Sequence, residues 1–216
     1  GRQEVNLDRS KISKYFFGKK VLVTGAGGSI GSELVKQCLG YDPDLLILLD
    51  STENNLFYID NKCKEFNSDT GVLPILGDIR DKNTINAVFN SFRPNVVIHA
   101  AAYKHVPMQE LNPWEAVNTN IQGTINLVNA SETFQVERFV LVSTDKAVNP
   151  TNVMGATKRV AEQVIQARSA DTQVKYMAVR FGNVIGSSGS VIPTFQRQIN
   201  NGGPITITDP NIKRFF

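Results

Sequence analysis

The sequence contains few of the residues that build metal sites and disulfide frameworks. Its 216 residues include two histidines and two cysteines, Cys38 and Cys63, and no Cys-x-x-Cys pair. This scarcity argues against a structural zinc site and predicts two reduced thiols in a cytosolic protein without a metal. The formal net charge of +3 is too small to indicate nucleic-acid binding by itself, so we expect no nucleic-acid partner.

Long apolar runs are also missing. The longest, at 45–49, has the length of a β-strand, whereas a membrane helix needs roughly 18 apolar residues. No secretory signal peptide is visible. The fractions of hydrophobic (41%) and charged (20%) residues are ordinary for a soluble globular domain. The chain starts at Gly1 and stops abruptly after Phe216, so we expect a fragment that is cut at both ends.

Short runs rich in Val, Ile and Leu alternate with longer segments of helical spacing. The apolar runs are 20–24, 45–50, 72–77, 96–101, 138–143 and 174–180. The helical segments include 29–39, 121–133 and 153–168. This alternation predicts an α/β fold with a Rossmann-type, doubly wound parallel sheet. The runs are apolar throughout rather than at every second position, which predicts strands buried on both faces.

The texture of the sequence divides the chain into three parts. Residues 1–18 are polar and form a lead-in arm, and 19–181 carry the alternating pattern of a nucleotide-binding domain. Residues 182–216 begin a smaller, truncated region that would cover a substrate. In this region we expect a loop over 182–190, a helix around 193–200 and a strand at 205–207.

A glycine-rich turn follows the first apolar run. Gly25, Gly28 and Gly31 come after a predicted strand and lead into a predicted helix. A lone glycine pattern is weak evidence, but this context is typical of dinucleotide binding. The glycines allow close approach of the backbone to a pyrophosphate, which N–H groups at the helix start, at Ser29 and Ile30, would bind. The alternative is a tight turn without a ligand.

A carboxylate ends the second strand, 19 residues beyond Gly31. At this place Asp50, with Ser51 beside it, would accept hydrogen bonds from the adenosine ribose and repel a 2′-phosphate. No Arg or Lys adjoins Asp50, which favours NAD over NADP as cofactor. The alternative role for Asp50 is a helix N-cap. Ser51 or Thr52 could serve as that cap, which would leave Asp50 unengaged for the ribose.

Two later segments carry residues with acid–base chemistry. The fifth apolar run ends in Thr144, Asp145 and Lys146. Further along, Met154 precedes Lys158 by four residues, which places both on one face of a helix. Short-chain dehydrogenases usually carry a Tyr four residues before this Lys. A methionine can neither donate nor accept a catalytic proton, so Met154 is an informative departure.

Six long segments carry a family resemblance: TGAGGSIGSEL, HAAAYKHVPMQE, NTNIQGTINL, VSTDKAVNPTNVMGATKR, VRFGNVIGSSGSVIPTF and ITDPNIKRFF. They resemble the bacterial UDP-N-acetylglucosamine 4,6-dehydratases, which are extended short-chain dehydrogenase/reductases of polysaccharide biosynthesis. The similarity runs from about residue 3 to the end. It is greatest to the large, membrane-anchored branch in which Met replaces the Tyr. The resemblance implies a UDP-sugar substrate, a homo-oligomer, and an inner-membrane anchor outside this chain with the present domain in the cytoplasm.

The resemblance implies a three-stage reaction with tightly bound NAD. Hydride leaves sugar C4, water is lost across C5 and C6, and hydride returns to C6. Thr144 would hold O4, and Asp145, if protonated, would be the general acid for the C6 hydroxyl. Lys146 would be the C5 base, and Lys158 would orient the nicotinamide ribose. Because Met154 cannot accept a proton, Asp145 is the expected acceptor of the O4 proton. Without the family, a solvated salt bridge between Asp145 and Lys146 is the alternative.

The resemblance also implies the residues that line the two ligands. The cofactor would be bound by Asp78 and Ile79 beside the adenine, by Ala100, Ala101 and Ala102, and by Asn118. The substrate would be bound by Lys104, Asn183, Gly189, Ser190 and Arg214. Asp78 could instead be a turn residue, and Arg214 could instead be an exposed surface residue.

Two other functions compete with the dehydratase. A UDP-hexose 4-epimerase shares the fold and the cofactor, but it relies on the Tyr that is missing here. A non-enzymatic interpretation is that the chain alone is an inactive NAD-binding module, because the region that covers the substrate is incomplete.

Overall fold

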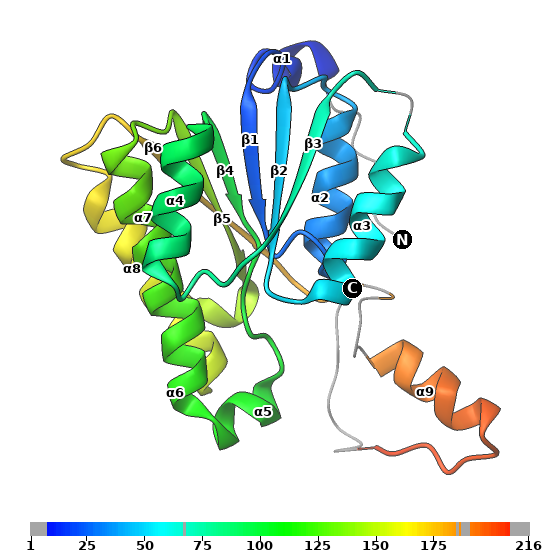
Figure 1. Ribbon diagram of the computed structural model, residues 1–216. Coiled ribbons are helices and arrows are strands. Elements are labelled where there is room, and N and C mark those ends of the chain that lie inside the picture. Colours follow the sequence, from blue (N-terminus) through cyan, green and yellow to red (C-terminus); the bar gives the residue numbers. More distant parts are fainter. Residues whose placement is uncertain (1–7, 67, 185, 187–190, 208–216) are drawn as a thin grey trace.

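The computed structural model describes residues 8–66, 68–184, 186 and 191–207. Its centre is a six-stranded sheet in the order β3-β2-β1-β4-β5-β6, in which every neighbouring pair is parallel (Figure 1). The strands are β1 Lys20–Thr24, β2 Leu45–Asp50, β3 Gly71–Leu76, β4 Val96–His99, β5 Arg138–Thr144 and β6 Lys175–Phe181. The predicted doubly wound fold is therefore confirmed.

Helices cover both faces of this sheet. The α-helices are α1 Arg9–Ser13, α2 Ser29–Leu39, α3 Glu53–Lys64, α4 Lys82–Phe92, α5 Val106–Leu111, α6 Pro113–Ala116, α7 Gly123–Thr133, α8 Val153–Arg168 and α9 Val191–Asn200. A π-helix, η1 Val117–Gln122, leads into α7, and a 3-10 turn, η2 Asp145–Ala147, follows β5. In Figure 1, α2 and α3 lie on one side of the sheet and α4, α7 and α8 on the other.

Two apolar cores, one on each face of the sheet, hold these layers together. Along β1, Leu22 belongs to the core beneath α4, α7 and α8, whereas Val21 and Val23 belong to the core beneath α2 and α3. All three side chains are fully buried, which is worth roughly 1.5–3 kcal/mol for each such side chain. The central strands are thus buried on both faces, as the apolar runs predicted. Cys38 and Cys63 are unpaired and buried in the second core.

The edges of the sheet and the end of the described chain differ from the sequence prediction. Strand β6 is largely exposed, with Val179 half exposed, because it is the edge strand and pairs only with β5 among the described residues. The predicted strand at 205–207 is wrong: this segment has no regular structure and both Ile205 and Ile207 are exposed. Among the described residues no strand lies beside it to satisfy its backbone groups. The predicted helix near 193–200 is present as α9, which buries no residue.

Two element boundaries also differ for local reasons. Strand β4 stops at His99 rather than at residue 101, because its partner β1 ends at Thr24, which pairs with His99. The helical segment predicted from 121 begins earlier, as the π-helix η1. No helix among the described residues is long and apolar enough to cross a membrane.

Candidate nucleotide and catalytic site

The strand order reverses between β1 and β4, and parallel α/β sheets bind ligands beside the carboxyl ends of strands at such a point. Gly25 follows β1 here with a φ of +65°, a conformation that favours glycine. A Cβ on Gly25 would lie 2.7 Å from the Cα of Ala101, after β4, and a Cβ on Gly31 would lie 1.9 Å from the carbonyl oxygen of Gly25. The turn and the start of α2 are therefore packed backbone to backbone.

Gly28 differs from the other two glycines of the motif. It is the N-cap of α2 in an extended conformation, and a Cβ there would meet only the carbonyl oxygen of Gly25, at 3.3 Å. Folding alone does not require a glycine at this position. The missing side chain leaves space directly before the helix start, where Ser29 and Ile30 follow. This is the cradle that a pyrophosphate would need.

The carboxylate of Asp50 is hydrogen-bonded to the glycine turn. Its side chain is 7% exposed, and its two oxygens accept hydrogen bonds from the backbone N–H groups of Gly27, at 2.9 Å, and Thr52, at 2.8 Å. Thr52 is the N-cap of α3, as one of the two alternatives predicted, although its side chain makes no cap bond. Asp50 is nevertheless not unengaged, because it accepts these two backbone bonds. Each carboxylate oxygen retains a further lone pair, so binding of a ribose by Asp50, with Ser51 beside it, stays a prediction.

Gly27 is a structural part of the turn that the sequence motif did not single out. A Cβ at Gly27 would lie 2.5 to 2.7 Å from the side chain and backbone of Asn55 in α3. Replacing Gly27 would therefore separate the turn from α3 and break its bond to Asp50. The signal in the sequence was the doublet Gly27-Gly28, of which only the second fits the spacing.

The segment after β3 lies at the same carboxyl edge of the sheet and carries Asp78 and Ile79, the residues predicted beside the adenine. Asp78 accepts hydrogen bonds from the backbone N–H and the guanidinium of Arg80, which also contacts Glu115. Burial alone would raise the pKa of Asp78, but these bonds from Arg80 outweigh burial and lower it. Ile79 is 5% exposed and packs in the core, where a Cβ on Gly123 would reach it. The side chain of Ile79 thus packs into the core against Gly123 rather than facing solvent.

The chain after β4 faces the π-helix η1. Ala100, Ala101 and Ala102 are partly buried, and Asn118 in η1 is exposed. The sequence missed Asn120, two residues further on, which is 1% exposed. Its amide bonds both backbone groups of Tyr103 and the Oγ1 of Thr157 in α8. Asn120 therefore fixes the loop after β4 against α8.

The end of β5 brings the predicted acid–base residues together. The Oγ1 of Thr144 donates to the Oδ1 of Asp145 at 2.9 Å, and the Nζ of Lys146 reaches the same oxygen at 3.1 Å. Burial of Asp145 acts to raise its pKa, but the bonds from Lys146 and Thr144 prevail and lower it. The salt bridge predicted as the alternative is present, with the Asp145 side chain about half exposed. In the free protein Asp145 is therefore a carboxylate.

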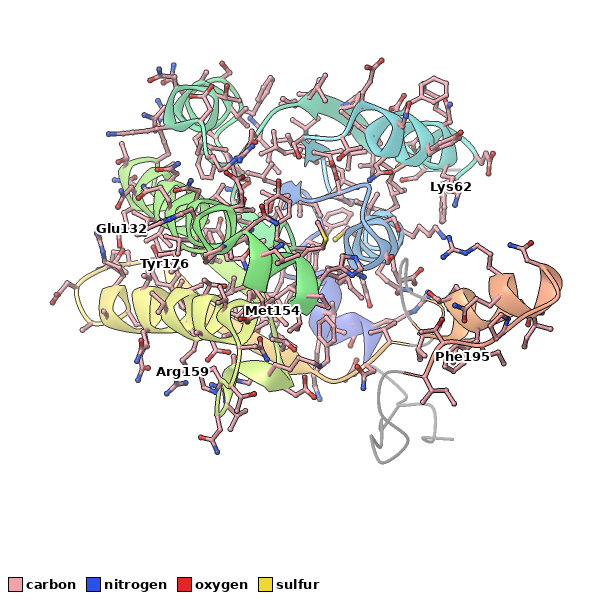
Figure 2. The ribbon with its side chains drawn as sticks, turned by 90° about the horizontal axis from the view of Figure 1, so that it is seen from below. Lys62, Glu132, Met154, Arg159, Tyr176 and Phe195 are labelled. Carbon is pink, nitrogen blue, oxygen red and sulfur yellow. The ribbon has the colours of Figure 1, made fainter. Side chains whose placement is uncertain are left out.

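Helix α8 carries a second group of functional residues against this turn. Lys158 is 4% exposed, and burial lowers its pKa to about 8, an effect that the negative charge of Glu162 opposes. Met154 lies one turn before Lys158 and is 5% exposed (Figure 2). A Cβ on Gly155 would lie 2.5 Å from the carbonyl oxygen of Lys146. The missing side chain of Gly155 therefore lets α8 approach the turn that carries Lys146.

Glu162 is an anchor that the sequence did not reveal. It accepts hydrogen bonds from Ser143 at the end of β5, from Arg180 in β6 and from Arg159 in α8. The bond from Arg180 is the main reason that its pKa falls to about 2. Ser143 directly precedes Thr144, so this ionic cluster fixes α8 relative to the carboxyl end of β5.

The predicted substrate residues are only partly within the described structure. Lys104 follows β4, and burial lowers its pKa. Asn183 follows β6, next to Gly182, where a Cβ would lie 3.8 Å from the Oδ2 of Asp145, so Asn183 lies at the carboxyl end of the sheet. Gly189, Ser190 and Arg214 lie outside the described residues. The described side chains include no cluster that could hold a metal ion.

Two surface hollows lie away from these residues. One of about 1010 Å³ opens at the amino ends of β5 and β6, and one of about 430 Å³ lies between α8 and β6. Neither is lined by the glycine turn or by Thr144, Asp145 or Lys146. The candidate site is therefore defined by its backbone cradle and its polar side chains rather than by either of these hollows.

The fold and the site together define a nucleotide-binding domain of the extended short-chain dehydrogenase/reductase class. The structure of Pen from Bacillus thuringiensis is 36% identical, with a TM-score of 0.82 over 90% of this chain and 59% of that chain. The dTDP-glucose 4,6-dehydratase DesIV from Streptomyces venezuelae, solved with NAD and TYD bound, is 26% identical, with a TM-score of 0.74 over 86% of this chain and 63% of that chain.

The chain belongs to the polysaccharide biosynthesis protein family, whose model matches residues 21–216. It is 49% identical to the capsular polysaccharide biosynthesis protein CapD of Staphylococcus aureus, over 100% of this chain and 36% of that protein. It is 37% identical to a UDP-N-acetylglucosamine 4,6-dehydratase (inverting) of Campylobacter jejuni, over 93% and 60%. It is 36% identical to a UDP-glucose 4-epimerase of Rickettsia bellii, over 93% and 59%. The chain thus spans about a third to three fifths of these relatives.

Proposed function

We propose that this chain is the cofactor-binding and catalytic part of a UDP-N-acetylglucosamine 4,6-dehydratase that uses bound NAD to make a UDP-4-keto-6-deoxy sugar for capsule, O-antigen or glycan biosynthesis. The observation that carries the proposal is the packing of α8, which bears Lys158 and has Met154 at the position of the usual tyrosine, against the turn of Asp145 and Lys146 that follows Thr144. Relatives named as dehydratases and as epimerases are almost equally similar, so the site must decide between them.

The residues present fit a dinucleotide. The cradle at Gly28 would receive the pyrophosphate, Asp50 would bind the adenosine ribose, and Lys158 would bind the nicotinamide ribose. The absence of a basic residue beside Asp50 favours NAD over NADP. When bound, NAD would supply the acceptor for the C4 hydride and the donor for its return to C6. Ala100, Ala101 and Ala102, which are partly buried, would border the ligand on the side of β4.

Asp145 can act twice in this scheme. As a carboxylate in the free protein, it suits the role of acceptor for the O4 proton, which Met154 cannot take. Once protonated, Asp145 is the acid that the departing C6 hydroxyl needs. The proton from O4 then leaves as part of the water molecule. The bond from Thr144 orients the Asp145 carboxyl group for both proton transfers.

Lys146 is the proposed base at C5. It can accept that proton only after its ammonium group has lost one and its ion pair with Asp145 has opened. Lys146, whose ammonium group exchanges its protons with solvent, would then return one proton to C5 as hydride reaches C6. The hydride therefore moves from C4 to C6, and the net change is the loss of one water.

The test is mass analysis of UDP-N-acetylglucosamine after incubation with a longer form of the protein that continues past Phe216. Loss of one water, about 18 mass units, supports the dehydratase. An altered sugar of unchanged mass identifies a UDP-hexose 4-epimerase, the second candidate, which the similarity to named epimerases favours. If the longer form is active and the 216-residue chain is not, the chain by itself is an inactive NAD-binding module. Cytoplasmic location, membrane anchoring and homo-oligomerisation stay predictions.

A further inference from the structure

A chain of buried hydrogen bonds connects the glycine turn to α8 through His99, which the proposed mechanism does not use. His99 ends β4 and is fully buried. Its Nδ1 lies 2.8 Å from the Oγ1 of Thr24, the last residue of β1, and its Nε2 lies 3.0 Å from the Oγ1 of Thr124 in α7. The imidazole thus bridges two elements that approach the site from opposite sides.

The direction of each bond follows from the groups at the two ends. The hydroxyl of Thr124 donates to the carbonyl oxygen of Asn120 at 2.7 Å, because a carbonyl can only accept. Thr124 must therefore accept from His99, so Nε2 carries a proton. Burial and the positive charge of Lys158 lower the pKa of His99 well below its ordinary value, so the ring is neutral and Nδ1 is an acceptor.

The remaining hydrogen bonds extend the network on both sides of His99, and in each bond the donor lies on the side of Ala101 and the acceptor on the side of Met154. The hydroxyl of Thr24 donates to Nδ1, and its oxygen accepts the N–H of Ala101 at 3.4 Å. On the other side, the amide of Asn120 donates to Thr157, whose hydroxyl donates to the carbonyl oxygen of Met154 at 2.8 Å. A charged His99 would leave the Thr24 proton opposite an N–H group and would place a cation near Lys158.

We propose that His99, as the neutral tautomer protonated on Nε2, is a positioning residue that sets the glycine turn against the π-helix and α8. Through Thr24 it holds Ala101, whose backbone is packed against Gly25 and shapes the cradle. Through Thr124 and Asn120 it holds the turn of α8 that precedes Lys158. The inference rests on the proposed binding of NAD, because it assigns the Thr24 half of the network to cofactor affinity.

The tautomer can be measured directly, because the chain has only two histidines, His99 and the exposed His105. Nitrogen NMR of protein labelled at histidine, with His105→Gln to assign the signals, should show His99 protonated on Nε2 alone. Its signals should not move between about pH 5 and 8, where an ordinary histidine titrates. Protonation on Nδ1, or titration in this range, overturns the proposal.

Two substitutions separate the halves of the network. The side-chain amide of His99→Gln can reach Thr124 in place of Nε2, but Thr24 loses its acceptor. The oxygen of His99→Asn can replace Nδ1, but Thr124 loses its donor. Each variant keeps one of the two buried hydrogen bonds of His99 and loses the other. By calorimetry, His99→Gln should weaken NAD binding about tenfold and His99→Asn by less than about twofold.

Equal weakening in both variants, or greater weakening in His99→Asn, overturns the proposal. If the two variants do not fold, Thr24→Val and Thr124→Val provide the same comparison, and Thr24→Val should have the larger effect on NAD affinity. If the unsubstituted protein does not bind NAD, the proposed function is wrong. The role of His99 as a fixed bridge is then decided by the tautomer alone.

Discussion

The glycine turn offers the sharpest separation of folding from cofactor binding. A Cβ at Gly31 would lie 1.9 Å from the carbonyl oxygen of Gly25, and backbone atoms cannot move aside without displacing the turn. A Cβ at Gly28 meets one oxygen at 3.3 Å, and its extended backbone suits any residue. Gly28→Ala should therefore retain stability but fill the pyrophosphate cradle, whereas Gly31→Ala should damage both.

The magnitudes follow from these distances. Overpacking at Gly31 should cost about 1–3 kcal/mol or more, whereas Gly28→Ala should change stability by less than about 1 kcal/mol and can raise it by restricting the unfolded chain. In a domain of this size 1 kcal/mol corresponds to about 2–4 °C in Tm. Saturation with NAD at about 100 times its Kd contributes about 2.7 kcal/mol, or about 5–11 °C.

The assay is thermal unfolding with and without NAD. Gly28→Ala should match the parent Tm without ligand and show a much smaller shift with NAD, and the larger side chain of Gly28→Val should abolish the shift. Gly31→Ala should melt several degrees lower even without ligand. An unreduced NAD shift in Gly28→Val, or a loss of stability in Gly28→Ala as large as in Gly31→Ala, would refute the reasoning.

Three further predictions test the rest of the site. In an active longer form, Lys146→Ala should lower the rate of elimination by about 10²–10⁴-fold, accumulate bound NADH by absorbance, and abolish exchange of the C5 proton with deuterated water; exchange at the parent rate would exclude Lys146 as the base. Asp50→Ala should weaken NAD binding in titrations; tighter binding of NADP than NAD by the parent protein would contradict the role of Asp50. Hydrogen bonds from Arg180 hold the folded-state pKa of Glu162 at about 2, below its ordinary 4.5. The stability that Glu162 contributes is therefore present above about pH 4.5 and lost as the pH falls toward 2, so in urea unfolding Glu162→Gln should lose less stability than the parent between about pH 5 and 3, and equal losses would rule out this linkage.

The sequence by itself determined the features that depend on near neighbours in the chain. Apolar runs between helical segments specify buried parallel strands, and the glycine turn between β1 and α2 follows from its spacing. The four-residue interval places Met154 and Lys158 on one helix face, because helical geometry is local. For the same reason the fold class could be predicted before the structure.

Only the tertiary structure decided which distant groups meet and which remain unpaired. The bond of Asp50 to Gly27 and the anchoring of Glu162 by Ser143 and Arg180 each join different elements. The predicted strand at 205–207 fails for the converse reason, because no strand in the described part of the chain pairs with this segment. The residue type determines which hydrogen bonds a side chain can form. The partner and the protonation state of that side chain depend on its burial and on which strands become neighbours. The packing of β4 against α7 therefore made His99 a buried bridge.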